Sequence, residues 1–190
     1  MKKNILFLTF LFPVFAFCQS KDIHLVIGGG PSMHGTGDLS GYSFLNQVEI
    51  KLNDHFFVSP GIQITNNSKT NQLTYFQLNY VSAGINVFAN INYFVLNRSR
   101  HHLSVGAGPL VRFQNSSVPV EAGTNINAAG EPILFIKYDK LQSVSFGYNI
   151  SPAYYFQCTK KISAGTKFIL QNDTRGDVIK TMSLFVGIKL

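Results

Sequence analysis

The stretch that decides the fold is SVSFGYNISPAYYF, residues 143–156, in which side-chain character changes at nearly every step. Its even positions are mostly large and apolar: Val144, Phe146, Tyr148, Ile150, Pro152, Tyr154 and Phe156. Its odd positions are mostly small or polar: Ser143, Ser145, Gly147, Asn149, Ser151, Ala153 and Tyr155. Successive side chains of a β-strand point to opposite faces, so this period of two predicts a strand with one apolar and one polar face.

The same alternation recurs along the chain, whereas the 3.6-residue period of an amphipathic helix is nearly absent. Eight segments carry it: residues 22–30, 42–52, 56–66, 73–91, 101–114, 133–157, 162–173 and 179–190. Soluble strands usually have about five or six residues, and most of these segments are longer. A tilted strand needs about 9–11 residues to cross a bilayer. The pattern therefore predicts an all-β, eight-stranded antiparallel up-and-down transmembrane β-barrel.

The connections between these segments are predicted to alternate in length. On one side lie residues 53–55 and 158–161, which are tight turns, and residues 92–100, which form a somewhat longer connection. On the other side lie longer loops, at residues 31–41, 67–72, 116–132 and 174–178. Short turns on one rim and longer loops on the other are typical of transmembrane barrels.

Which face of the strands is apolar separates two classes of eight-stranded barrel. A soluble lipocalin-like binder of a small apolar ligand has an apolar interior. In this chain the polar face carries mainly small groups, such as Ser59, Ser145 and Ser163, while the apolar face is large and aromatic. An eight-stranded lumen is just wide enough for side chains to fill it. We therefore expect the small polar groups inside and the large apolar groups in lipid, and an apolar lumen would instead favour the lipocalin-like alternative.

The composition agrees with a lipid-facing exterior. Of the 190 residues only 13% are charged, compared with about 25% in a typical soluble domain. The chain has 17 Phe, 8 Tyr and no Trp, so Phe and Tyr must supply the aromatic girdles of the membrane interfaces. We predict Phe56, Tyr154 and Phe156 toward the short-turn rim. Toward the loop rim we predict Tyr42, Phe44, Tyr75 and Tyr138.

The N-terminus has the pattern of a secretory signal peptide. Lys2 and Lys3 precede an apolar run over residues 5–17, and Ala16 and Cys18 suit the −3 and −1 positions of a cleavage site. We expect residues 1–18 to be removed and residues 19–190 to form one barrel domain. The mature net charge is then (16 − 2) − 9 = +5, which we assign to the rims beside anionic lipid headgroups because an exported protein does not meet nucleic acid. Lipidation of Cys18 is the rival, disfavoured by the bulky Phe17.

Several features together resemble a known family. These are the signal peptide, the eight alternating strands, the strand LSVGAGPLV at residues 103–111 and the apolar final strand TMSLFVGIKL at residues 181–190. They resemble the small outer-membrane β-barrel family of Gram-negative bacteria, a porin-like family that includes the outer-membrane protein A transmembrane domain. Many members end in an aromatic residue read by the assembly machinery, whereas this chain ends in Leu190, with Phe185 the nearest aromatic.

The resemblance implies export to the cell outer membrane and contact with outer-membrane lipid and the barrel-assembly machinery. We expect a monomer with a structural or surface-interaction role, in which the long loops contact a partner of unknown identity. Strand parity also predicts that Glu49, Arg112 and Lys167 point into the lumen. A charge in a narrow lumen is costly unless paired, so we expect structural pairing and a packed interior. A narrow channel is a weaker alternative.

The sequence offers little for catalysis, a cofactor or a metal, and we expect none of the three. Residues 30–35 have the glycine spacing of a phosphate loop but lack its lysine. His101 and His102 are adjacent on a predicted strand and so point to opposite faces. A lipid-modifying enzyme stays open as an alternative, with Ser32, His34 and Asp38 of the first loop as its candidate residues.

The fourth segment breaks its own parity. Phe76, Leu78 and Tyr80 are apolar at even positions, and Val81, Ala83, Ile85, Val87 and Ala89 are apolar at odd positions. One inserted residue would let both sets face outward. We therefore predict a β-bulge near residues 80–82, the alternative being a regular strand with Phe76, Leu78 and Tyr80 inside.

The signal-peptide assignment makes the first prediction. N-terminal sequencing of the protein isolated from membranes should begin at Gln19. A chain that still begins at Met1, or a lipid-modified Cys18, would contradict it.

Overall fold

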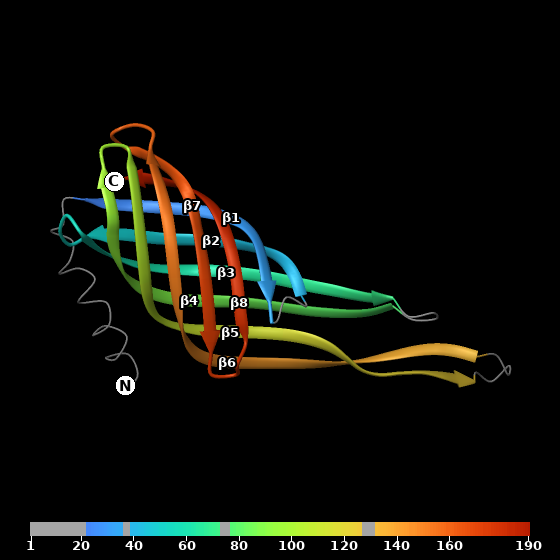
Figure 1. Ribbon diagram of the computed structural model, residues 1–190. Helices are drawn as coiled ribbons and strands as arrows, with labels where there is room; N and C mark the ends of the chain where they lie inside the picture. The colour runs from blue at the N-terminus through green and yellow to red at the C-terminus, as the bar shows by residue number, and fades with distance from the viewer. Residues whose placement is uncertain (1–21, 36–38, 73–76, 127–131) are drawn as a thin grey trace, which may run out of the picture.

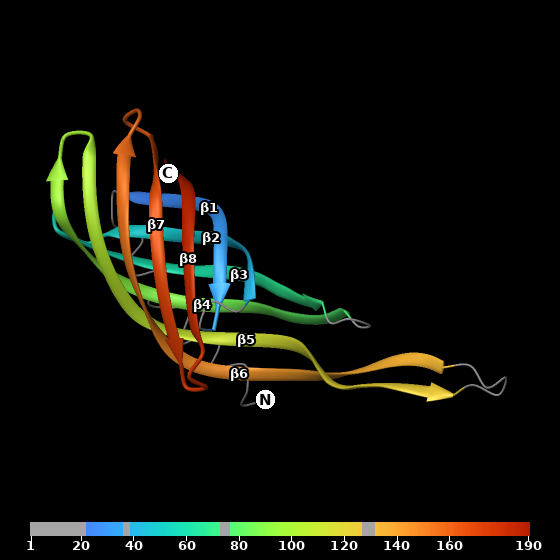
Figure 2. The same ribbon diagram turned by 45° about the vertical axis from the view of Figure 1, so that its right-hand side comes forward.

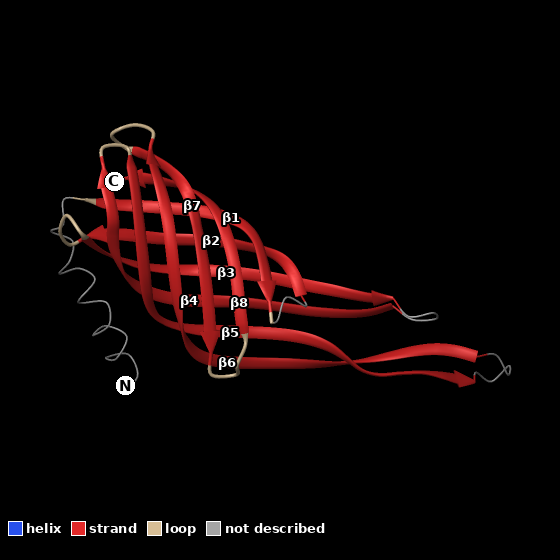
Figure 3. Ribbon diagram, in the orientation of Figure 1, coloured by secondary structure: helices blue, strands red, loops and turns tan. Residues whose placement is uncertain are grey.

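A computed structural model describes residues 22–35, 39–72, 77–126 and 132–190, and their regular structure is entirely β (Figure 3). The strands are β1 Ile23–His34, β2 Leu39–Lys51, β3 Phe56–Gln72, β4 Gln77–Arg98, β5 His101–Ile126, β6 Pro132–Gln157, β7 Ile162–Asp173 and β8 Val178–Lys189. No helix in this part of the chain is long and apolar enough to cross a membrane. The predicted signal peptide lies outside the described residues and stays a prediction.

The eight strands form one closed antiparallel barrel. Each strand pairs with its neighbours in the chain, and β1 pairs with β8 to complete the ring (Figure 1). The closing ladder runs from His24 opposite Lys189 to His34 opposite Ile179. Closure gives the backbone N–H and C=O groups of the barrel wall partners on both sides, as hydrocarbon requires. The predicted fold class is confirmed.

The side chains of β6 show which face is which. The apolar positions face outward, with Val144, Phe146 and Tyr148 between 54% and 62% exposed. The polar positions Asn149 and Ser151 face inward and are no more than 1% exposed. A polar interior with an apolar exterior is the reverse of a lipocalin, so the soluble-binder alternative is not supported.

The rim that carries the short turns also carries both ends of the barrel. Near the termini, the Leu190 backbone N–H donates to the Ile23 carbonyl, with an N···O distance of 2.9 Å. The connection predicted to be longer on this rim is in fact a two-residue turn at residues 99–100, because β4 continues to Arg98. The register of β4 on β5 shifts between Phe94 and Leu96, which places a β-bulge in β4 shortly before the turn.

The opposite rim differs most from the expectation. The predicted long loops are largely strand, since β1 extends to His34, β3 to Gln72 and β5 to Ile126. The β3–β4 and β5–β6 hairpins leave the barrel and project beyond it (Figures 1 and 2). Polar Ser, Thr and Asn residues indicated loops, but the antiparallel ladder satisfies the backbone of these residues in water as well as in lipid.

The predicted bulge near residues 80–82 is wrong. Pairing of β3 with β4 is unbroken from Gln72 opposite Gln77 to Phe56 opposite Tyr93. Leu78 and Tyr80 therefore share the inner face with Ser82 and lie half-buried in the projecting hairpin. Apolar groups are tolerated there because the inner face has left the packed lumen. Phe76 lies outside the described residues.

The aromatic residues largely follow the predicted girdles. Phe56, Tyr154 and Phe156 lie exposed near the short-turn rim, where Phe56 and Tyr93 pack with ring centroids 5.1 Å apart. Tyr42 and Phe44 are exposed toward the opposite rim. Tyr138 belongs instead to the projecting β5–β6 hairpin, where its hydroxyl accepts a hydrogen bond from the Asn79 N–H. Tyr75 lies outside the described residues.

A closed barrel of this kind predicts a specific behaviour on gels. The unboiled protein should migrate at a different apparent mass from the boiled protein, because the sealed ladder resists detergent unfolding. Identical mobility before and after boiling would contradict a stable barrel.

Candidate functional site

The lumen holds the three charges singled out from the sequence. Glu49 of β2, Arg112 of β5 and Lys167 of β7 point inward and are 7%, 1% and 1% exposed. Each stands in a strand whose outward positions are apolar, so strand parity alone places it inside. Their partners decide what these charges can do.

Glu49 and Lys167 belong to one buried hydrogen-bonded chain. The Tyr155 hydroxyl and the Gln47 Nε2 both donate to Glu49 Oε1, each at 2.7 Å. The Lys167 Nζ donates to Gln47 Oε1 at 2.7 Å. Gln47 thus links the carboxylate to the ammonium group, and both charges have hydrogen-bond partners in a water-poor interior.

A layer of amides lies farther along the lumen. Gln171 Nε2 donates to Gln63 Oε1 at 2.5 Å, and Gln63 Nε2 donates to Thr181 Oγ1 at 2.9 Å. Asn86 Nδ2 donates to Gln171 Oε1 at 2.9 Å. These side chains therefore join β3 and β4 to β7 and β8 across the interior.

Arg112 pairs with a residue that sequence reasoning missed. Its Nη1 lies 3.7 Å from Asp173 Oδ2, and both side chains are at most 3% exposed. The Ser145 hydroxyl also donates to Asp173 Oδ2, at 2.9 Å. Asp173 has the same parity as Lys167 on β7, and this is the signal that could have found it. Gly84 leaves room for the guanidinium, since a Cβ there would lie 3.2 Å from Arg112 Nε.

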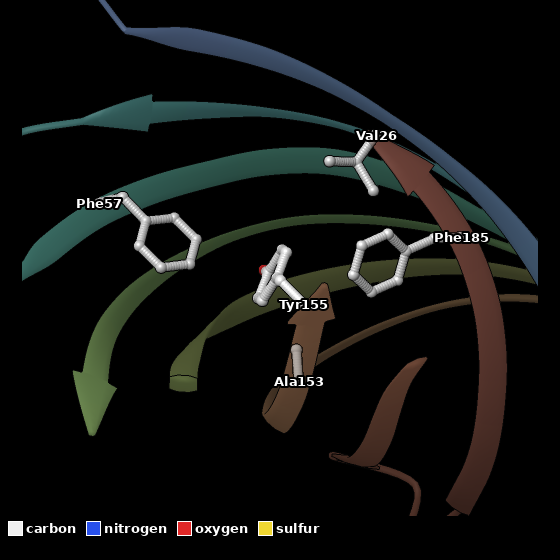
Figure 4. Packing of buried hydrophobic residues seen from close by; sticks show 5 residues of the cluster. All are labelled: Val26, Phe57, Ala153, Tyr155 and Phe185. Carbon is white, nitrogen blue, oxygen red and sulfur yellow. The ribbon is translucent and has the colours of Figure 1, made fainter. Parts of the chain in front are cut away.

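Two clusters of buried apolar side chains also fill the lumen. Near the short-turn rim, Figure 4 shows Val26, Phe57, Ala153, Tyr155 and Phe185 packed against one another. The rings of Tyr155 and Phe185 meet edge to face with centroids 5.0 Å apart. A second buried cluster, Leu45, Phe88, Leu110 and Ile169, lies elsewhere in the interior. The interior is packed at these levels, which favours a filled lumen over a channel.

A pocket of about 230 Å³ opens at the short-turn rim, with Phe57, Phe94 and Tyr155 in its lining. Lys189 donates a hydrogen bond to Asp22 at its edge. That bond lowers the pKa of the Asp22 carboxyl below its usual value. Among the described residues no three His, Cys, Asp or Glu side chains are placed to hold a metal ion.

Two of the three residues considered for catalysis, Ser32 and His34, lie among the described residues. The Ser32 hydroxyl donates to Asn67 Oδ1, and His34 Nε2 lies 3.1 Å from Asp177 Oδ2. Both side chains are buried at the end of β1, and Asp38 lies outside the described residues. Ser32 and His34 thus have separate partners.

The two neighbouring histidines also have separate partners. His101 Nδ1 lies 2.7 Å from the exposed Tyr154 hydroxyl, and His102 Nδ1 lies 2.7 Å from Asn97 Oδ1. Tyr154 is an outward residue of β6, whereas His102 lines the pocket at the short-turn rim. The two imidazole rings therefore lie on opposite faces of β5.

The β5–β6 hairpin projects beyond the closed part of the barrel (Figures 1 and 2). β4 accompanies β5 as far as Ser117, and residues 118–126 of β5 pair only with β6. The ladder of β7 on β6 begins at Gly147, and the Phe146 carbonyl accepts a hydrogen bond from the Thr174 N–H, so residues 132–145 have a strand on one side alone. A register shift between Pro119 and Glu121 bends the hairpin at Val120.

No protein-family model matches the chain, and no curated protein matches it in sequence. Solved structures are similar in fold. Neisserial surface protein A superposes with a TM-score of 0.59 at 13% identity, covering 90% of this chain and 98% of that one. Ail, the attachment invasion locus protein of Yersinia pestis, gives 0.54 at 8% identity, covering 90% and 99%. Ail in complex with the heparin analogue sucrose octasulfate gives 0.53 at 9% identity, with the same coverages.

These likenesses show that the chain has the fold of small eight-stranded outer-membrane barrels. The likeness agrees with the apolar exterior that the exposed fractions show. Fold and exterior together indicate a transmembrane barrel of the outer-membrane type, with short turns on one rim and projecting hairpins on the other.

The buried chain of Glu49, Gln47 and Lys167 makes a prediction about stability. Lys167→Met should lower the free energy of unfolding by about 3 kcal/mol, because it leaves the Glu49 charge buried without its cation. Glu49→Gln combined with Lys167→Met should recover more than half of that loss. Urea unfolding in lipid vesicles measures both.

Lys180→Met is the matched control, since Lys180 lies on the outer face of β8 and is exposed. It should change the free energy by no more than about 0.5 kcal/mol. Glu49→Gln alone is measured as well, and if its loss and that of Lys167→Met simply add in the double variant, the two charges do not interact.

Proposed function

We propose that this protein is a small outer-membrane barrel with a surface-interaction role, and that it contacts its partner through the β5–β6 hairpin. The observation that carries the proposal is the open edge of β6, where residues 132–145 pair with β5 alone. The proposed contact surface is thus a pair of strands that extends from the closed barrel, in place of the long loops expected from the sequence.

An open strand edge presents unpaired backbone N–H and C=O groups, which a partner in extended conformation can pair with. Apolar side chains surround this edge. Ile133 and Leu141 of β6 are 51% and 48% exposed, and Ile126 at the end of β5 is 77% exposed. An extended segment rich in β-branched residues would bury these side chains while completing the ladder.

The fold neighbours support a role at the cell surface. One is described as an attachment invasion protein and another as a surface protein, and the structure of Ail with a heparin analogue shows that protein with a polyanionic ligand. On this chain the exposed charged residues at the end that carries the projecting hairpins are predominantly basic. They are Lys69, Lys137, Lys140, Arg175 and Lys180, against the acidic Glu121 and Asp139.

The same proposal makes the protein a non-enzymatic monomer that needs no cofactor. The separate partners of Ser32 and His34 support the absence of a serine-type catalytic set. The lumen charges act structurally, each held by a hydrogen bond or ion pair that fills the interior. The remaining partners are outer-membrane lipid and the machinery that assembles barrels.

The test removes the hairpin and keeps the barrel. Residues 118–139 are replaced by Asn-Gly, which joins Ser117 to Lys140 across a pair that already faces in the ladder. Binding is measured with the protein in lipid vesicles against an array of short unstructured peptides and against immobilised heparin. The full chain should capture a subset of the peptides, and the shortened chain should capture none of them.

The matched control shortens the other hairpin, replacing residues 69–80 by Asn-Gly between the paired Ser68 and Val81. It should bind the same peptides as the full chain. Unchanged peptide binding after removal of the β5–β6 hairpin would overturn the proposal. Binding to heparin alone would assign the surface to a polyanion and not to an extended segment.

A further inference from the structure

A groove of about 630 Å³ runs across the outer face of β3, β4, β5 and β6, at the level where the two hairpins leave the barrel. The strand registers arrange its outward side chains in rows. One row is apolar: Ile64, Ile85, Phe113 and Val144. The next is Asn66, Ala83, Asn115 and Gln142, and the one beyond is Ser68, Val81, Ser117 and Lys140. The surface thus passes from hydrocarbon character to amides and then to a cation within three rows.

We propose that this groove binds one lipid whose phosphate groups give it a net negative charge. An acyl chain lies on the apolar row, and the headgroup lies against the amide row and Lys140. The groove continues directly into the lipid-facing wall, since the row on the barrel side is Ile62, Val87, Val111 and Phe146. A site that begins inside the hydrocarbon belt is reached by lipid before any soluble partner.

The middle row is built for a polar headgroup. Asn66, Asn115 and Gln142 are exposed, and their amides make no hydrogen bond to other described residues. Ala83 lies between Asn66 and Asn115 in the ladder, and its short side chain leaves depth at the centre of the row. Amides that flank a recess can donate to phosphate, ester or hydroxyl oxygens of a lipid.

Lys140 supplies the charge. It is exposed on the outer face of β6, one row beyond Gln142, and forms no ion pair with the described part of the chain. An ammonium at the headgroup level forms charge-assisted hydrogen bonds with a phosphate. The Lys140 charge and the recess at Ala83 therefore favour a lipid with net negative phosphate charge over a neutral or zwitterionic lipid.

The test counts lipids retained by the full chain in native mass spectrometry after detergent extraction. The added probes are diphosphorylated lipid A and phosphatidylethanolamine. The unaltered protein should keep one lipid A under conditions that strip phosphatidylethanolamine. Ala83→Trp, which fills the recess, should weaken retention about tenfold. Lys140→Gln should remove the preference for lipid A.

Two matched controls lie outside the groove. Ala89→Trp changes an exposed outward residue of the same strand, and Lys180→Gln removes an exposed lysine of β8. Both should retain lipid A as the unaltered protein does. Equal loss in Ala89→Trp and Ala83→Trp, or no preference for lipid A in the unaltered protein, would overturn the proposal. If Ala83→Trp does not fold, as judged by gel mobility, the test is the comparison of Lys140→Gln with Lys180→Gln. An equal preference for lipid A in these two variants would then overturn the proposal.

Discussion

In hydrocarbon no water is available for backbone N–H and C=O groups, and the rest of this structure depends on satisfying them within the chain. The pairing of β1 with β8 completes that requirement by joining the ends of the sheet. Once the sheet is closed, every strand has one face toward lipid and one toward a narrow lumen. The alternation seen in residues 143–156 is the direct consequence, with large apolar groups outside and small or hydrogen-bonded groups inside.

The narrowness of an eight-stranded lumen explains the unusual burial of charge. Arg112 and Lys167 are each 1% exposed, and neither would be tolerated without a partner. Arg112 forms an ion pair with Asp173, and Lys167 donates a hydrogen bond to Gln47, which in turn donates to Glu49. β5 loses its pairing with β4 beyond Ser117, and the β7 ladder on β6 begins only at Gly147. Between these points water can satisfy backbone groups, so the strands can present open edges. The proposed contact surface and the lipid groove both arise at this boundary.

Strand parity made the barrel and its inside-out distribution of polarity predictable. Residues such as Glu49, Ser145 and Lys167 could be placed inward from their neighbours alone, because the side-chain period of a strand is two. Parity fixes the face but not the partner. The bond from Lys167 to Gln47 joins residues 120 positions apart, and no local pattern encodes such a distance.

The length of the strands was less predictable. Composition indicated loops over residues 116–132, yet β5 extends to Ile126. A hairpin in water can be built from polar residues, since only its hydrogen-bonded ladder is required. The prediction of a bulge near residues 80–82 was wrong because it, too, overlooked the part of the strand that lies in water. The parity switch was interpreted as if both halves of the strand faced lipid, whereas Leu78 and Tyr80 lie in the projecting part.

The central claim is that the apolar positions of the strands face lipid, and depth-resolved fluorescence quenching along β6 tests it most directly. In a Cys158→Ser background, single cysteines at residues 148–151 are labelled with an environment-sensitive fluorophore, and the protein is folded into vesicles whose acyl chains carry a nitroxide quencher. The account predicts strong quenching at Tyr148 and Ile150 and weak quenching at Asn149 and Ser151. Equal quenching at all four positions, or the opposite alternation, would contradict it.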